Sequence, residues 1–590
     1  MKKVIKKNIF MIPLVVWIVI IPIVVKAKFY PNPLAEYPWY SQDAIQADFF
    51  LYYKSMLVTF MGGIMLLLLA WQISKIHTKS TLITHDTNIF IPIILYLVFV
   101  VLSSMFSEYK YFCIHGMPDQ FETVWNQMSY VVVIFYCFYF VANYNFENNI
   151  LLFIFVGATL VGLICILQYF KIDIYRLIYA SKGYSFTFEE GTVYGPFYNI
   201  NYVGYYILLF LPLFIMFLLF YPTIKVKVAS AILSLCLLLA LVGAESVTAQ
   251  IACVAVSLFS LLFILFKKAQ EKNILYLPII IILAGILGVC IILVPHIFQY
   301  VQTLNTEKTD LENIYTHDEN VEIDYKGQKL FISMQQNETN VSFILSDQYQ
   351  AGVPSEMIYS EDGYYSFQIL DERFKDMRIM PVVIKEDPII YGFMVTIDGQ
   401  NWCFTNQMTE DHTYYYYTKL YRLMKLTDEN VSADFAPLVN VSRLASGRGY
   451  IWNKTIALLK DYILLGSGAD TFTLIYPNDD VVDKYNNGYD NMFITKPHNL
   501  YLQIAVQSGM LSLICFLVFY GWYFVSSLCL YFREKFDQPL NIFGFAIMLG
   551  TLGYMIAGLT NDSTITVAPL YWALMGIGIG INHKLRFKKN

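Results

Sequence analysis

Apolar residues fill most of the chain in long runs that short polar stretches separate. A run of about 17–25 such residues is long enough to cross the hydrocarbon core of a bilayer as a helix. The pattern predicts twelve spans, at residues 9–25, 52–74, 89–106, 128–144, 150–170, 202–221, 228–243, 248–266, 274–294, 501–528, 541–560 and 567–582. We interpret the first run as a retained span, because no clear small-residue cleavage site follows it.

Residues 295–500 interrupt this membrane pattern. From about residue 318 to residue 426, apolar and polar residues alternate as they do in β-strands, for example in VEIDYKGQKLFI and YGFMVTIDGQNWCF. Helical spacing returns at Trp452, Ile456 and Leu459, after Ser446, a residue type that caps helices. The predicted organisation is a membrane domain, a β-rich domain, a segment with a surface helix and a second membrane domain, at 1–294, 295–445, 446–500 and 501–590.

Composition and charge agree with this organisation. The chain is 57% hydrophobic and only 14% charged, with a mean hydropathy of +0.50, whereas soluble proteins are about 25% charged. The fold class we predict is therefore a polytopic α-helical membrane protein with an inserted, mostly β domain. Lysine and arginine gather in the loops that would face the cytoplasm, which predicts cytoplasmic termini and an external 295–500 segment. The absence of a basic soluble surface excludes nucleic-acid binding.

His498 is the first candidate for chemistry, because KPHNLYLQ leads directly into an apolar run. Pro497 suits the first turn of a helix, and a helix amino end favours an anion and a neutral imidazole. A neutral His498 beside an anion site would act as a general base, and Asn499 would orient a hydroxyl or a phosphate by donating a hydrogen bond. The alternative is an interfacial histidine with no chemical role.

Arg448 is the second candidate, at the start of the predicted surface helix. A guanidinium binds phosphate through two parallel hydrogen bonds, although an arginine at a membrane surface also meets lipid headgroups. Asn199 and Asn201 stand after a Gly-Pro turn, either as helix caps or contacts or as groups that bind a polar ligand; for Asn201 alone we favour the helix cap. Further cations on the same side are Lys496, Arg443, Lys182 and Arg176.

Two stretches together resemble the O-antigen ligase and O-antigen polymerase superfamily. SGRGYIWNKTIALLKDYILLGSGADTF followed by HNLYLQIAVQSGMLSL is similar to its C-terminal pattern, and YGPFYNINYVGYYIL is similar to an earlier G-x-F-x-N-x-N segment. The resemblance covers most of the membrane part but not the β-rich domain. One departure is VGAESVTAQIA, where many members carry a Ser-Arg pair and this chain has Ser246 without an arginine.

The resemblance implies a metal-independent, inverting glycan ligase or polymerase without a cofactor. Its donor would be a glycan on a polyprenyl pyrophosphate, and its acceptor a hydroxyl of a glycan, wall polymer or protein, at the outer face of a bacterial cytoplasmic membrane. His498 would be the base or the group that orients the acceptor, and Arg448 would hold the pyrophosphate. Lys182 or Arg176 would replace the missing arginine, unless the donor is handled differently or the chain is inactive.

Two other classes of protein fit parts of the sequence. Twelve spans with both ends inside is a common layout of secondary transporters, but we find no similarity between the two halves, and the notable polar residues gather at the outer face. A sensor or attachment protein would use the β-rich domain to bind a ligand, but no cytoplasmic domain is evident to relay a signal. The sequence leaves open the sugar, the acceptor and the choice between ligase and polymerase.

Overall fold

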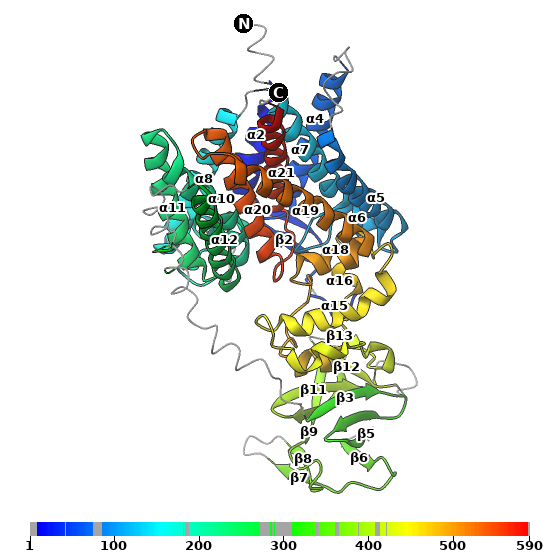
Figure 1. The fold of residues 1–590 in the computed structure, drawn as a ribbon. Helices are drawn as coiled ribbons and strands as arrows, with labels where there is room; N and C mark the ends of the chain where they lie inside the picture. Colours follow the sequence, from blue (N-terminus) through cyan, green and yellow to red (C-terminus); the bar gives the residue numbers. More distant parts are fainter. Residues whose placement is uncertain are drawn as a thin grey trace.

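The computed structural model describes residues 9–41, 43–74, 85–144, 147–180, 182, 188–271, 284–285, 288, 310–336, 341–359, 365–386, 389–407, 414–419 and 422–587. Within these ranges, nine helices are long and apolar enough to cross a membrane. They are α4 (Tyr52–Ile73), α5 (Phe90–Phe106), α7 (Val124–Asn143), α8 (Glu147–Tyr169), α10 (Ile200–Phe220), α11 (Ile224–Ala244), α12 (Val247–Glu271), α19 (Met510–Arg533) and α20 (Pro539–Ala557). These helices fit the predicted polytopic helical class, and Figure 1 shows them gathered in one bundle.

The count of twelve spans is not confirmed. The first predicted run forms α2 (Ile12–Val15), a π-helical turn and α3 (Ile21–Ile23), which together are shorter than a span. The run at 274–294 lies outside the described residues apart from 284–285 and 288. The last run forms α21 (Ala568–Phe587), whose final turn carries Lys584 and Arg586 and which is not among the nine.

Close helix pairs form the centre of the bundle, where α10 packs on α20 and α7 packs on α21. A Cβ added at Gly550 of α20 would lie 2.4 Å from the carbonyl oxygen of Leu209, and one added at Gly576 of α21 would lie 2.5 Å from that of Ile134. Glycine at these two contacts therefore lets the backbones approach, as small residues do between membrane helices.

The inserted region folds into two antiparallel sheets, which confirms the predicted β-rich region. One sheet contains β3 (Leu311–Thr316), β4 (Val321–Tyr325), β5 (Gln328–Gln336) and β6 (Val341–Asp347). The other contains β7 (Ser355–Tyr359), β8 (Tyr365–Ile369), β9 (Arg378–Glu386), β10 (Ile389–Ile397), β11 (Gln400–Thr405), β12 (Tyr416–Lys419) and β13 (Arg422–Met424). The ring of Phe343 contacts Phe367 at 5.1 Å and Phe393 at 5.4 Å between centroids, so the two sheets share one core.

Four short helices lie between the bundle and the sheets (Figure 1). They are α15 (Arg448–Tyr462), α16 (Phe472–Ile475), α17 (Val481–Asn486) and α18 (Leu500–Ser508). The sheets contact this layer directly, because Trp402 of β11 packs against Tyr485 of α17 and Asn486 donates a hydrogen bond to the carbonyl of Leu311 at 2.8 Å.

Two predicted boundaries in this layer are wrong. The expected span at 501–528 is broken at Gly509, so that α18 is short and the membrane helix α19 begins at Met510. Gly509 has φ +87°, and a Cβ there would lie 2.2 Å from the carbonyl oxygen of Leu464, which excludes a continuous helix. The residue that caps α15 is Gly447 with φ +90°, and not Ser446.

Candidate active site

The loop that follows α20 brings His498 and Arg448 to neighbouring residues. We call residues 558–563 the late loop. Its Asp562 is fully buried, with one carboxylate oxygen 3.2 Å from Nδ1 of His498 and the other accepting a hydrogen bond from the amide of Asn499 at 3.1 Å. The preceding residue, Asn561, accepts a hydrogen bond from Nη2 of Arg448 at 3.4 Å. Two residues of one loop therefore hold the two side chains that the sequence predicts for chemistry.

His498 is held on both sides by backbone contacts. The carbonyl of Pro497 accepts a hydrogen bond from the indole of Trp452 in α15 at 3.0 Å, and the amide of Leu500 donates to the carbonyl of Gly558 at 2.8 Å. His498 itself has φ +50°, a left-handed conformation that is uncommon for a residue with a Cβ and is often found at functional sites. Its side chain is 36% exposed, so the ring combines a fixed backbone with access from outside.

The amino end of α18 differs from the expected open anion site. Asn499 caps the helix by accepting from the amides of Tyr501 and Leu502, each at 3.0 Å, and its own Nδ2 donates to Leu559 at 2.8 Å. The amides of Asn499 and Leu500 are taken by the late loop. The anion at this helix end is therefore the Asp562 carboxylate. The side-chain amide of Asn499 donates to Leu559 of the late loop and not to a ligand.

Arg448 is under-partnered for a guanidinium. Burial lowers its pKa from the ordinary value, against the opposing effect of the nearby Asp562 carboxylate. Within the described part of the chain, its one hydrogen bond is the long contact with Asn561, although a guanidinium has five N–H donors. The remaining donors leave this side chain able to bind a carboxylate or phosphate.

Lys496, two residues before His498, is a second cation near the site, and it is buried. Its ammonium group donates to the hydroxyl of Tyr202 at 3.0 Å and lies 5.3 Å from the centroid of that ring. Burial alone lowers the pKa of this lysine, but Tyr202 and Asp562 outweigh burial and the pKa is raised overall. Lys496 therefore keeps its positive charge close to the late loop.

Three carboxyl groups near Lys496 were not foreseen from the sequence: Asp119, Glu122 and Asp470. Burial is the main cause that raises the pKa of each, and Asp470 reaches about 8. Asp470 accepts from the amides of Met117 at 2.7 Å and Glu122 at 3.1 Å. These contacts join the turn after α15 to the segment that precedes α7.

Asp562 was missed as well, although the sequence contains a signal for it. It is the single Asp, Glu, Lys or Arg between residues 538 and 583, a region that is otherwise apolar or neutral. A charged residue isolated between two apolar helices is costly unless it has a partner or a function.

The other predicted cations lie away from the late loop, and two of them, Arg176 and Lys182, have local side-chain partners. Arg176 contacts the carbonyl of Phe188 and the carboxylate of Glu190, the latter at 3.5 Å. Lys182 lies over the ring of Tyr179 at 5.6 Å. Arg443 is exposed on the turn before α15, where its carbonyl accepts from the amide of Gly447.

Asn199 and Asn201 form part of the connection between α10 and α12. The cap of α10 is Asn199, which accepts from the amide of Asn201 at 2.8 Å, and not Asn201 as we expected. Asn201 instead accepts a hydrogen bond from the hydroxyl of Ser246 at 2.7 Å. At the second residue of α12, the hydroxyls of Thr248 and Thr560 lie 2.9 Å apart, which ties this helix end to the late loop.

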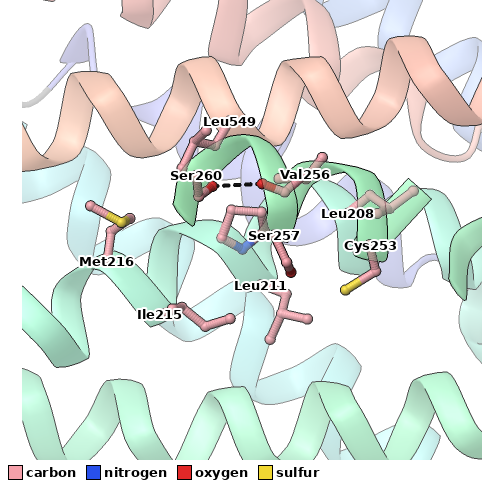
Figure 2. Close-up of a pocket in the computed structure, with 10 residues that line it drawn as sticks. Leu208, Leu211, Ile215, Met216, Cys253, Val256, Ser257, Ser260 and Leu549 are labelled. Carbon is pink, nitrogen blue, oxygen red and sulfur yellow. Dashed lines mark hydrogen bonds between the residues drawn. The ribbon is translucent and has the colours of Figure 1, made fainter. Parts of the chain in front are cut away.

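A small apolar pocket lies between α10, α12 and α20 (Figure 2). Its lining is apolar except for Ser257 and Ser260, and the hydroxyl of Ser260 is bound to the carbonyl of Val256 at 2.7 Å. This lining carries no charged side chain. Across the described residues, no group of three or more His, Cys, Asp or Glu is arranged to hold a metal ion, and metal independence stays a prediction.

Residues 403–517 match a family model described as O-antigen ligase. The matched segment begins in β11 and ends in α19, so it includes both Arg448 and His498. The match confirms the resemblance to the O-antigen ligase and polymerase superfamily and supports a membrane glycosyltransferase of that type. Comparison with curated proteins and with solved structures gives no match.

Proposed function

We propose, starting from the match of residues 403–517 to the O-antigen ligase family, that this protein transfers a glycan from a polyprenyl-pyrophosphate donor to a hydroxyl acceptor. The observation that carries the proposal is the late loop, whose consecutive residues Asn561 and Asp562 contact Arg448 and His498. A base and an under-partnered guanidinium held by one loop are suited to a reaction in which a hydroxyl attacks and a phosphate leaves.

His498 serves as the base in this proposal. Its Nδ1 faces Asp562, so Nε2 is the nitrogen that takes the proton of the acceptor hydroxyl. The acceptor oxygen forms a bond to the anomeric carbon of the donor sugar from the side opposite the pyrophosphate, which inverts that carbon. The bond from the anomeric carbon to the pyrophosphate oxygen breaks, and both its electrons leave with the polyprenyl pyrophosphate. The Asp562 carboxylate then faces the imidazolium that has formed.

Arg448 and Lys496 supply positive charge for the leaving pyrophosphate, which carries more negative charge as the bond breaks. Arg443 lies just before the same helix, on the exposed side, and is assigned to longer-range attraction of the donor. Asn499 acts through its contacts with the late loop, and Asn199 and Asn201 act through their contacts at the starts of α10 and α12. The replacement of the missing family arginine by Lys182 or Arg176 stays a prediction. Each of these side chains would have to leave its local partner to reach the donor.

The site and the β-rich region are placed outside a bacterial cytoplasmic membrane in this proposal, with both termini in the cytoplasm. The distribution of lysine and arginine supports that orientation. The end of α21 lies at the end of the bundle away from the sheets (Figure 1), as the orientation requires. The acceptor, whether a surface polysaccharide, a wall polymer or a protein, would meet the donor between the β-rich region and the helix bundle.

Complementation of a deletion strain of the native bacterium tests the proposal. We expect His498→Ala and Arg448→Ala, at membrane levels equal to wild type, to leave the surface glycan unrestored and the polyprenyl-pyrophosphate glycan accumulated. Tyr349→Ala, which changes a side chain that is 78% exposed in the β-rich region, is the control and should complement. Gels of surface polysaccharide and mass spectrometry of extracted lipid give both readouts. Full complementation by both site variants would refute the mechanism.

A further inference from the structure

We propose that Glu122 is a positioning residue of this site: it fixes Ser563, and through Ser563 it sets the place of Asp562 against His498. The inference rests on the proposed function. It assigns the positioning of the base to a residue that is far from His498 in the sequence. Glu122 lies directly before α7 and touches neither His498 nor Arg448 through any hydrogen bond of the described residues.

Glu122 receives two hydroxyl groups on one carboxylate oxygen. The hydroxyl of Ser563 donates at 2.7 Å, and the hydroxyl of Tyr130, two turns into α7, donates at 2.8 Å. The side chain is 4% exposed, so water does not replace these bonds cheaply. The bond to Ser563 is therefore an anchor between the start of α7 and the late loop.

Ser563 is also held by α18. Its amide donates to the side-chain carbonyl of Gln503 in α18 at 2.7 Å. Gln503 stands one turn after Asn499, whose amide binds Asp562. The hydroxyl and the amide of Ser563 thus lie between α7 and α18, which leaves the adjacent Asp562 little freedom to move away from His498.

The anchor is itself braced. Asp470 accepts from the amide of Glu122 at 3.1 Å and from that of Met117 at 2.7 Å, so the backbone of Glu122 is held as well as its side chain. The sequence of contacts runs from Asp470 to Glu122, Ser563, Asp562 and His498. Ser563 and Asp562 are neighbours in the chain, and the other three links join groups that are distant in the sequence, which is how a tertiary fold places a catalytic base.

The role requires a hydrogen-bond acceptor at residue 122 and a donor at residue 563. Glu122→Gln keeps a side-chain oxygen as acceptor, whereas Glu122→Ala and Ser563→Ala each remove one end of the bond. Loss of the bond frees the late loop, which should lower the turnover by about 10-fold and change the KM for the donor by less than about twofold. Because the two residues act through one bond, the double variant should lose about 10-fold and not about 100-fold.

The experiment uses the full-length protein in lipid nanodiscs and the lipid-linked glycan extracted from the deletion strain. Wild type and His498→Ala are measured alongside Glu122→Ala, Glu122→Gln, Ser563→Ala and the double variant. We expect Glu122→Gln to keep more than half of the wild-type turnover. Ser563→Ala removes a single hydroxyl, so it tests the inference even where Glu122→Ala fails to fold.

Three outcomes overturn the inference: wild-type turnover in Ser563→Ala, a loss in Glu122→Gln as large as that in Glu122→Ala, or multiplicative losses in the double variant. A different result marks failure of the proposed function. If His498→Ala turns over the donor as fast as wild type, the site has been assigned wrongly; if His498→Ala is inactive and Ser563→Ala is fully active, only the role of Glu122 falls.

Discussion

Two cations on one helix, Arg448 and Lys454 of α15, have opposite surroundings. The side chain of Lys454 is 2% exposed, and its ammonium group lies 2.7 Å from Asp434 and 2.6 Å from Asp483. Arg448, less than two turns earlier, has one long hydrogen bond to a neutral amide. The paired lysine joins α15 to α17, whereas the arginine keeps unused donors. The difference teaches that a side chain meant for a ligand is recognised by the partners it lacks.

The largest expected effect comes from removing the paired cation. Lys454→Ala leaves Asp483, whose side chain is 33% exposed, without its cation, and loss of this partly buried pair costs about 2 kcal/mol. We expect a clear fall in the thermal unfolding temperature of the purified protein. Lys460→Ala, an exposed lysine on the same helix, is the matched control. Equal stability of the two variants would contradict the structural role of Lys454.

Changing the under-partnered cation should spare stability and damage activity. We expect Arg448→Ala to lower the transfer rate by about 100-fold, because it removes a donor that faces developing negative charge. Arg448→Lys should restore little, since an ammonium group does not reproduce the planar fork. Initial rates with extracted donor and an unfolding scan on the same sample separate the two effects. An Arg448→Lys protein with wild-type rate would show that charge alone suffices.

Asp470, a buried acid whose hydrogen bonds come from backbone amides, sharpens the comparison through pH. Burial raises the pKa of Asp470 to about 8, from an ordinary value of 3.8. Between these values the folded protein holds a proton that the unfolded chain releases, so this group makes the free energy of unfolding decrease as the pH rises. Asp470→Asn keeps an acceptor for the two amides and removes the titration. Unfolding scans from about pH 5 to about pH 8 should therefore show a flatter decline in the variant; parallel slopes would contradict the assignment.

The smallest expected effect concerns a residue with no charge. Asn199→Ala removes the cap of α10, which costs about 1 kcal/mol of stability. Because packing against α20 also holds α10 in place, the transfer rate should change by less than about threefold. Unfolding scans and initial rates measure both quantities. A loss of rate comparable to that of Arg448→Ala would mean that Asn199 contacts the substrate.

The sequence predicted the parts of the molecule that short-range patterns determine. The apolar runs gave the helices, the alternation between 318 and 426 gave the sheets, and the motif around His498 gave the candidate base. It misplaced the α18–α19 boundary because Gly509 lies inside an apolar run, and nothing in hydropathy shows that Leu464 approaches it.

The rest of the site depends on contacts that one sequence does not encode visibly. Ser563 and Glu122 are 441 residues apart, and Asp562 meets the amide of Asn499 across 63 residues. Only the tertiary fold brings these groups together. The amino end of α18 was expected to be open to an anion because the local pattern shows a helix start and does not show that Asp562 already occupies it.

The close approach at Gly509 also brings together the two ends of the segment that contains His498. The amide of Met510 donates to the carbonyl of Ile463 at 2.8 Å, so the chain leaves α15 and enters α19 at the same point. Everything between residues 464 and 509, including His498, starts and ends there. Such a segment is a natural unit for chimaeric enzymes, because exchange of a loop with adjoining ends leaves the flanking helices where they were.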